Sequence, residues 1–217
     1  MDKPSSKRGL SHIEKVLNVW AIILLLWSVY RGVFKVDLGI WFDELIAKPL
    51  IFLYPAYYFI VNVEKKRFFD GISLRRRSIL TDVSAGILVG VIFFVIGYIN
   101  AGMKFTGAVS MQIIVIALAA AFTEEAIARG FVLTRLYDHY KNKIIAAILA
   151  SVLFFIMRIP MIFTNPALVG ADLVQAMVMN IVLSIIISLL FLERPRLLFA
   201  VAIHAMYILS AYLFALS

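Results

Sequence analysis

Two carboxylates and a guanidinium lie within the hexapeptide Glu124-Glu125-Ala126-Ile127-Ala128-Arg129. The sequence around it is apolar from Val109 to Leu133, which is long enough for a membrane helix. A charge at the centre of such a helix costs about 2.5–3.5 kcal/mol on insertion scales, so three charges so close together indicate a function. A carboxylate in this position can act as a general base toward water or as a metal ligand.

The spacing within the hexapeptide divides these roles. Glu125 and Arg129 are four residues apart with the acid first, which favours an ion pair on one helix face. Glu124 points about 100° away around the helix and needs another partner, so it is the candidate base or ligand. The alternative is a buried salt-bridge network of all three residues that only fixes helix packing.

Two further polar residues interrupt later apolar segments. His204 lies about eight residues inside the segment that begins at Leu197, and Arg158 follows Phe154-Phe155-Ile156-Met157, just before Pro160. Proline is expected to end that helix. At a rise of about 1.5 Å per residue, His204 and Glu124 reach similar depths, so they are predicted to share one layer of the bundle.

The composition places these residues in a membrane protein. Hydrophobic residues make up 63% of the 217 residues and charged residues 16%, against roughly 45–50% and 25% in soluble domains. Cysteine is absent, which excludes disulfides and thiol chemistry. The formal net charge is +8, but the basic residues flank apolar segments and form no basic face with interleaved aromatics, so nucleic-acid binding is not expected.

The predicted fold is an all-α, polytopic transmembrane bundle of about seven spans. Residues 1–108 supply three spans and a basic cytoplasmic loop, and residues 109–217 form a core of four spans that carries the polar site. The predicted spans are Val16–Tyr30, Leu45–Val63, Ile79–Ile99, Val109–Leu133, Ile144–Met157, Leu173–Leu192 and Leu197–Leu213.

The distribution of lysine and arginine predicts the orientation. With a cytoplasmic N-terminus, 16 of the 21 basic residues lie on the cytoplasmic side. The positive-inside rule therefore favours a multi-pass protein of the cell membrane with its N-terminus in the cytoplasm. The basic residues left for the opposite side are Arg31, Lys35, Lys48, Lys104 and Arg158.

Small residues predict two close helix contacts. Gly86-x-x-x-Gly90 permits another helix to approach, either inside the bundle or in a dimer. The alanines from Ala117 to Ala121 thin the helix just before Glu124, so neighbouring helices can approach the charged turn.

These motifs together resemble those of a known family. Glu124-Glu125-x-x-x-Arg129 followed by Gly130, then Phe154-x-x-x-Arg158, then His204, is similar to the CAAX-protease and bacteriocin-processing family of intramembrane proteases. The similarity covers roughly residues 117–212. It implies that Glu124 activates water, that Glu125 and Arg129 support it, and that His204 is the histidine of the last motif.

The chain departs from the family pattern at two positions. Arg158 stands where the resemblance implies a histidine, and Ile208 stands where it implies an asparagine. Arginine neither accepts a proton nor ligates zinc, and its charge stabilises an ionised Glu124, which weakens that residue as a base. Only Glu124, His204 and Glu125 remain as zinc ligands, whereas a catalytic zinc usually has three protein ligands, so a zinc cofactor is poorly supported.

Three functions remain open from the sequence. The first is an intramembrane endopeptidase acting on membrane-associated or peptide substrates, in which Glu124 activates water, His204 assists and Arg158 stabilises the tetrahedral intermediate. The second is a catalytically inactive relative that acts as a scaffold, regulator or immunity factor toward another membrane protein, with Arg158 paired to Glu124. The third is a proton-relaying transporter. The short chain is typical of a prokaryotic member, for which a prenylated substrate is not expected.

Overall fold

The computed structural model describes residues 10–34, 38–74, 79–100, 110–164 and 169–214, and every regular element in these ranges is helical. Six helical segments are long and apolar enough to cross a membrane, and Leu197–Leu213 is a shorter apolar helix beside them. The predicted all-α polytopic bundle is confirmed.

The helices follow one another with short connections. Several α-helices continue directly into a wider π-helical stretch, written here as η. The elements are α1 (His12–Val29) with η1 (Tyr30–Phe34), α2 (Ile40–Phe42) with η2 (Asp43–Ala47), α3 (Lys48–Tyr58) with η3 (Phe59–Val63), α4 (Phe68–Gly71), α5 (Ile79–Asn100), α6 (Met111–Glu125) with η5 (Ala126–Leu133), α7 (Thr134–Tyr140), α8 (Lys143–Phe163), α9 (Gly170–Glu193) and α10 (Leu197–Leu213).

Hydrogen bonds at helix starts explain where several elements begin. Ser11 and Glu14 form a reciprocal capping box at α1. Ser110 accepts a hydrogen bond from the backbone N–H of Ile113 at α6, and Asn142 accepts two from the first turn of α8. These side chains satisfy backbone donors that have no partner within the helix.

Two predicted helix ends were wrong. Pro160 does not end its helix, since it lies inside α8, which continues to Phe163. Proline is tolerated within membrane helices where other groups satisfy the carbonyl that it frees one turn earlier. At the end of this helix the Thr164 hydroxyl donates to the Pro160 carbonyl at 2.7 Å. The fourth span also continues past Leu133 to Tyr140. It begins at Met111, whereas the predicted start, Val109, lies outside the described residues.

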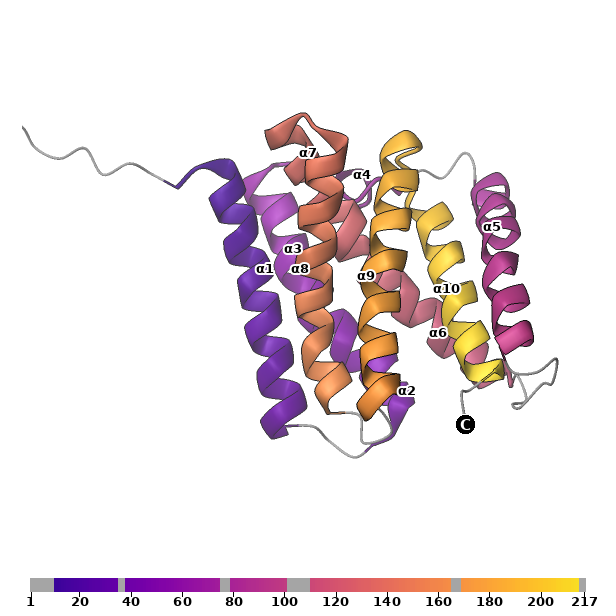
Figure 1. Ribbon diagram of the computed structural model, residues 1–217. Coiled ribbons are helices and arrows are strands. Elements are labelled where there is room, and N and C mark those ends of the chain that lie inside the picture. The colour runs from indigo at the N-terminus through magenta and orange to yellow at the C-terminus, as the bar shows by residue number, and fades with distance from the viewer. Residues whose placement is uncertain (1–9, 35–37, 75–78, 101–109, 165–168, 215–217) are drawn as a thin grey trace, which may run out of the picture.

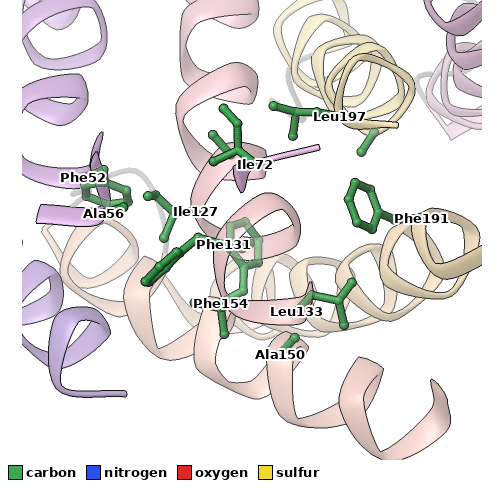
Figure 2. Close-up of a cluster of buried hydrophobic side chains, with 14 of the residues drawn as sticks. Phe52, Ala56, Ile72, Ile127, Phe131, Leu133, Ala150, Phe154, Phe191 and Leu197 are labelled. Atoms are coloured by element: carbon green, nitrogen blue, oxygen red, sulfur yellow. The ribbon is translucent and has the colours of Figure 1, made fainter. Parts of the chain in front are cut away.

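The bundle is arranged with α1 at one edge and α5 at the other (Figure 1). The short helices α4 and α7 lie at one end of the bundle, and α2 lies at the opposite end. A cluster of buried apolar side chains fills the space between α3, η5, α8, α9 and α10, with Phe131 of η5 near its centre (Figure 2). This packed cluster supports the helices that carry the charged residues.

The glycines of the Gly86-x-x-x-Gly90 motif pack inside the bundle, where α5 contacts α10. A Cβ on Gly86 would stand 2.6 Å from the Cβ of Ala202 and 2.7 Å from the backbone oxygen of Phe199. A Cβ on Gly90 would meet the side chain of Met206 at 2.5 Å. The motif therefore serves packing within one chain, as the first of the two predicted uses proposed.

We expect Gly86→Ala to destabilise the bundle by about 1–3 kcal/mol, because the added methyl group meets backbone on α10 and something must shift. Gly32→Ala is the control, since nothing lies within 4 Å of a Cβ at that position, and we expect little loss. Thermal unfolding of both variants in detergent measures the difference. Equal stability of Gly86→Ala and wild type would contradict this contact.

Candidate functional site

Glu125 lies at the centre of a buried cluster that joins three helices. Its Oε1 accepts hydrogen bonds from Nη1 of Arg129 at 3.0 Å and pairs with Nδ1 of His204 at 2.7 Å. Nη2 of Arg129 continues to Ser184 on α9, reaching its carbonyl at 3.0 Å and its hydroxyl at 2.9 Å. Glu125, Arg129 and His204 are each at most 1% exposed. The ion pair predicted from the spacing of Glu125 and Arg129 is thus present.

Glu124 is held by two cations from other helices. Its Oε1 accepts a hydrogen bond from Nζ of Lys48 at 2.8 Å, and its Oε2 accepts one from Nη1 of Arg158. Nε2 of His204 lies 3.7 Å from the same Oε2, so His204 and Glu124 share a layer as predicted. Both carboxylate oxygens of Glu124 are therefore engaged by positive charge.

Lys48 is a site residue that the sequence analysis did not identify, since it was counted only among the basic residues of the outer side. It begins α3 and is 2% exposed, and its Nζ bridges Glu124 and Oε2 of Glu44 at 2.5 Å. Its Nζ also lies 5.7 Å from the centre of the Trp27 ring. Two carboxylates and an aromatic ring compensate for the loss of its hydration. The spacing of Glu44 and Lys48, four residues apart, was the available signal.

Arg158 lies on α8, and its side chain is only 13% exposed and points at Glu124 inside the bundle, the pairing that the second of the three predicted functions includes. The ring of Phe154, one turn earlier on α8, lies 5.8 Å from its guanidinium carbon and 4.7 Å from that of Arg129. The same ring meets His204 edge-on at a centroid distance of 6.1 Å. Phe154 thus separates the two charged clusters and contacts both.

Glu124 lines a cavity of about 570 Å³. This volume is within the usual range for small-ligand pockets, about 300–1,000 Å³. Its charged lining is balanced, with three cations and three carboxylates, and most of the remaining lining is apolar or aromatic. The charged residues are Arg31, Lys48, Arg158, Asp43, Glu44 and Glu124.

Residues 106–210 match the family model described as Rce1-like, type II CAAX prenyl endopeptidase Rce1-like. Over these residues the chain is similar to the type II CAAX prenyl endopeptidases, in agreement with the resemblance to the CAAX-protease and bacteriocin-processing family. No curated protein and no solved structure matches the chain in the two other comparisons.

This chain differs from the family pattern at two positions. Arg158 occupies the position expected to be histidine, and it binds the carboxylate that the family pattern assigns to water activation. Ile208 lines the cavity and presents no hydrogen-bonding side chain there. His204 is present, but its Nδ1 is committed to Glu125. In this arrangement the carboxylate of Glu124 that lines the cavity is paired with two cations.

The donor set does not fit a zinc ion. Lys48 and Arg158 occupy the two oxygens of Glu124 that would face a metal. Within the described part of the chain, no three His, Asp or Glu residues converge in a way that could hold an ion. Neither an ammonium nor a guanidinium is a zinc ligand in its charged form. We therefore derive no step through a metal.

Gly130, the glycine that follows Arg129, is explained by a close backbone contact. A Cβ at this position would stand 2.8 Å from the backbone oxygen of Ile72 and 3.1 Å from its Cα. Without a side chain at Gly130, the segment around α4 can pack directly against η5. This contact packs the segment around α4 against η5, at the end of the bundle that lies away from the cavity.

A second buried ion pair fixes that end, and the sequence analysis missed it. Nε and Nη2 of Arg135 donate to the two carboxylate oxygens of Glu64, at 3.0 and 2.6 Å. Nη1 of Arg135 also donates to the carbonyls of Gly71 and Gly130. This network joins the end of η3, α4, η5 and α7.

Burial acts to raise the pKa of Glu64, but the hydrogen bonds and charge of Arg135 outweigh burial, so the pKa lies below its ordinary value. A depressed pKa stabilises the fold above the unfolded-state value and loses that stabilisation as pH falls. We expect Glu64→Gln to cost about 2 kcal/mol at pH 7 and progressively less below about pH 4. Unfolding in detergent across this pH range measures it. Glu193→Gln, which removes an exposed pair with Lys143, is the control and should change little at any pH.

Proposed function

We propose that this protein is a non-catalytic member of its family, which binds a segment of another membrane protein or a membrane-associated peptide in the cavity without hydrolysing it. The observation that carries the proposal is the engagement of both oxygens of Glu124 by Lys48 and Arg158. A general base needs a free lone pair within hydrogen-bond reach of its water molecule. A cation at each oxygen stabilises the ionised carboxylate and so weakens Glu124 as a base toward water.

The size and lining of the cavity support a binding role. It offers an apolar wall and a charge-balanced floor, which suits an apolar peptide segment better than an ion or a strongly charged ligand. Because the cations and carboxylates neutralise one another, the site stays stable inside a bundle of membrane helices without a bound metal. A regulator, scaffold or immunity factor would use such a site.

The second candidate is the endopeptidase, with Glu124 as base and His204 as its partner. One observation favours it, since Glu124 lines the cavity in which a substrate would lie. Catalysis would require Lys48 or Arg158 to leave Glu124 when substrate enters.

The cellular setting proposed for either function is the same. We propose a prokaryotic cell membrane, with the N-terminus in the cytoplasm because most basic residues flank that side. We propose that the lipid bilayer surrounds the six candidate spans and the shorter apolar helix of the described residues. Residues 1–108 are proposed to frame the core of residues 109–217, and they contribute Arg31, Asp43, Glu44 and Lys48 to the charged lining of the cavity.

Photo-cross-linking in living host cells tests the binding role. A photoreactive residue replaces Ile208 in the cavity, and a matched one replaces Ile148, which is 46% exposed on α8 and lies outside the cavity lining. We expect the Ile208 position alone to capture one defined polypeptide segment, uncleaved, in both wild type and Glu124→Gln.

Two results would overturn the proposal. One is the capture of the same molecules at Ile208 and Ile148, which would mean that no partner enters the cavity. The other is a captured peptide that ends at a new terminus in wild type and not in Glu124→Gln, which would show cleavage.

A further inference from the structure

The cavity lies entirely in one half of the bundle. On α6 its lining stops at Glu124, on α8 it begins at Arg158, and on α10 it starts at Tyr207. Beyond this layer lies the packed apolar cluster, in which Ile127, Phe131 and Ile72 are fully buried. The cavity therefore extends from Glu124 toward the end of the bundle that carries α2 and the last turn of α8 (Figure 1).

At that end, Arg31 links three elements across the cavity. Its Nη1 donates to Oδ2 of Asp43 on η2 at 3.1 Å, and its Nε and Nη2 donate to the Thr164 hydroxyl at 3.2 and 2.7 Å. Asp43 accepts a further hydrogen bond from the Tyr30 hydroxyl at 2.5 Å. Arg31, Asp43 and Thr164 all line the cavity. The guanidinium of Arg31 thus joins η1 to the start of η2 and to the residue that follows α8.

We infer that this end is the mouth through which a partner's segment enters the cavity, and that the bonds of Arg31 to Asp43 and Thr164 close the mouth until the segment enters. The inference rests on the proposed binding function. We expect the partner's segment to be uncharged and apolar. The charges that line the cavity balance one another, and Ile40, Ile116 and Ile162 form an apolar wall. The segment would come from the side of the membrane that faces α2.

The absence of cysteine in the chain allows a direct test by thiol labelling. Ala120→Cys places one thiol in the cavity, one helical turn before Glu124. Ala147→Cys is the matched reporter, since it is equally small and buried but lies outside the cavity lining. Val33→Cys and Tyr140→Cys, both at exposed positions at opposite ends of the bundle, identify the two membrane sides.

A membrane-impermeant thiol reagent is applied to each side of sealed vesicles that contain the full chain. We expect the Ala120 reporter to react from the side that labels Val33→Cys, and about tenfold faster or more when Arg31→Ala or Thr164→Val is added. Arg196→Ala removes a cation that pairs with Asp82 elsewhere and should leave the rate unchanged. Labelling of Ala147→Cys should stay slow in every variant.

The inference is overturned if the Ala120 reporter reacts from the Tyr140 side, or if neither Arg31→Ala nor Thr164→Val raises its rate above that of Arg196→Ala. If Arg31→Ala accelerates Ala147 equally, that variant has loosened the bundle, and Thr164→Val then decides the outcome. Labelling requires neither a partner nor hydrolysis, so its failure is distinct from failure of the proposed function.

Discussion

Lys48→Met is expected to lower the free energy of unfolding by about 3–5 kcal/mol, because it removes one partner from a buried network of opposite charges. Glu44 and Glu124 would both lose the ammonium that now lies 2.5 and 2.8 Å from their oxygens. The three side chains are between 3% and 10% exposed, so the two carboxylates have little contact with bulk water in place of the ammonium. Unfolding by denaturing detergent from mild micelles measures the loss.

The double variant Lys48→Met, Glu44→Gln provides the test of mechanism. It removes the cation together with the carboxylate that has the fewest other contacts, while Glu124 keeps Arg158. We expect it to recover much of the stability lost in the single variant. Lys143→Met, which breaks an exposed pair with Glu193, is the control. A Lys48→Met variant as stable as Lys143→Met would show that the buried network contributes little.

The second large effect is a gain of hydrolysis when the cations at Glu124 are removed and the family residues are restored. Arg158→His with Ile208→Asn replaces one cation, but Lys48 still binds Oε1 of Glu124. Adding Lys48→Met and Glu44→Gln frees that oxygen for water. A general base contributes about 10²–10⁴-fold to a rate, so we expect new protein termini in host membranes only with all four changes.

The same four changes combined with Glu124→Ala are the control, and they should abolish the new termini. If wild type already cleaves proteins and Arg158→His with Ile208→Asn reduces that cleavage, Arg158 takes part in catalysis. That result would favour the endopeptidase over the binding function.

Local spacing was sufficient to predict part of the site. Glu125 and Arg129 pair because they are four residues apart on one helix. The depth of His204 followed from the rise of a helix, and the contact of α5 with α10 followed from Gly86 and Gly90. Each of these features depends on one helix or on one face of a helix.

The missed contacts join residues that are distant in sequence. Lys48 and Glu124 are separated by 76 positions, and Glu64 and Arg135 by 71. No periodicity within a helix indicates such partners. The burial of Lys48 was not predicted for the same reason. A carboxylate on each of two neighbouring elements makes that burial favourable.

A comparison of protein termini in host cells that carry wild type, Glu124→Gln or Glu124→Ala tests most directly whether Glu124 acts as a base. All three are expressed at the native level, and the amount of each protein in the membrane is measured alongside. We expect the same set of termini in all three strains. Termini that are present with wild type and missing with Glu124→Gln, at equal protein level, would contradict the account and would identify the substrate of a working protease.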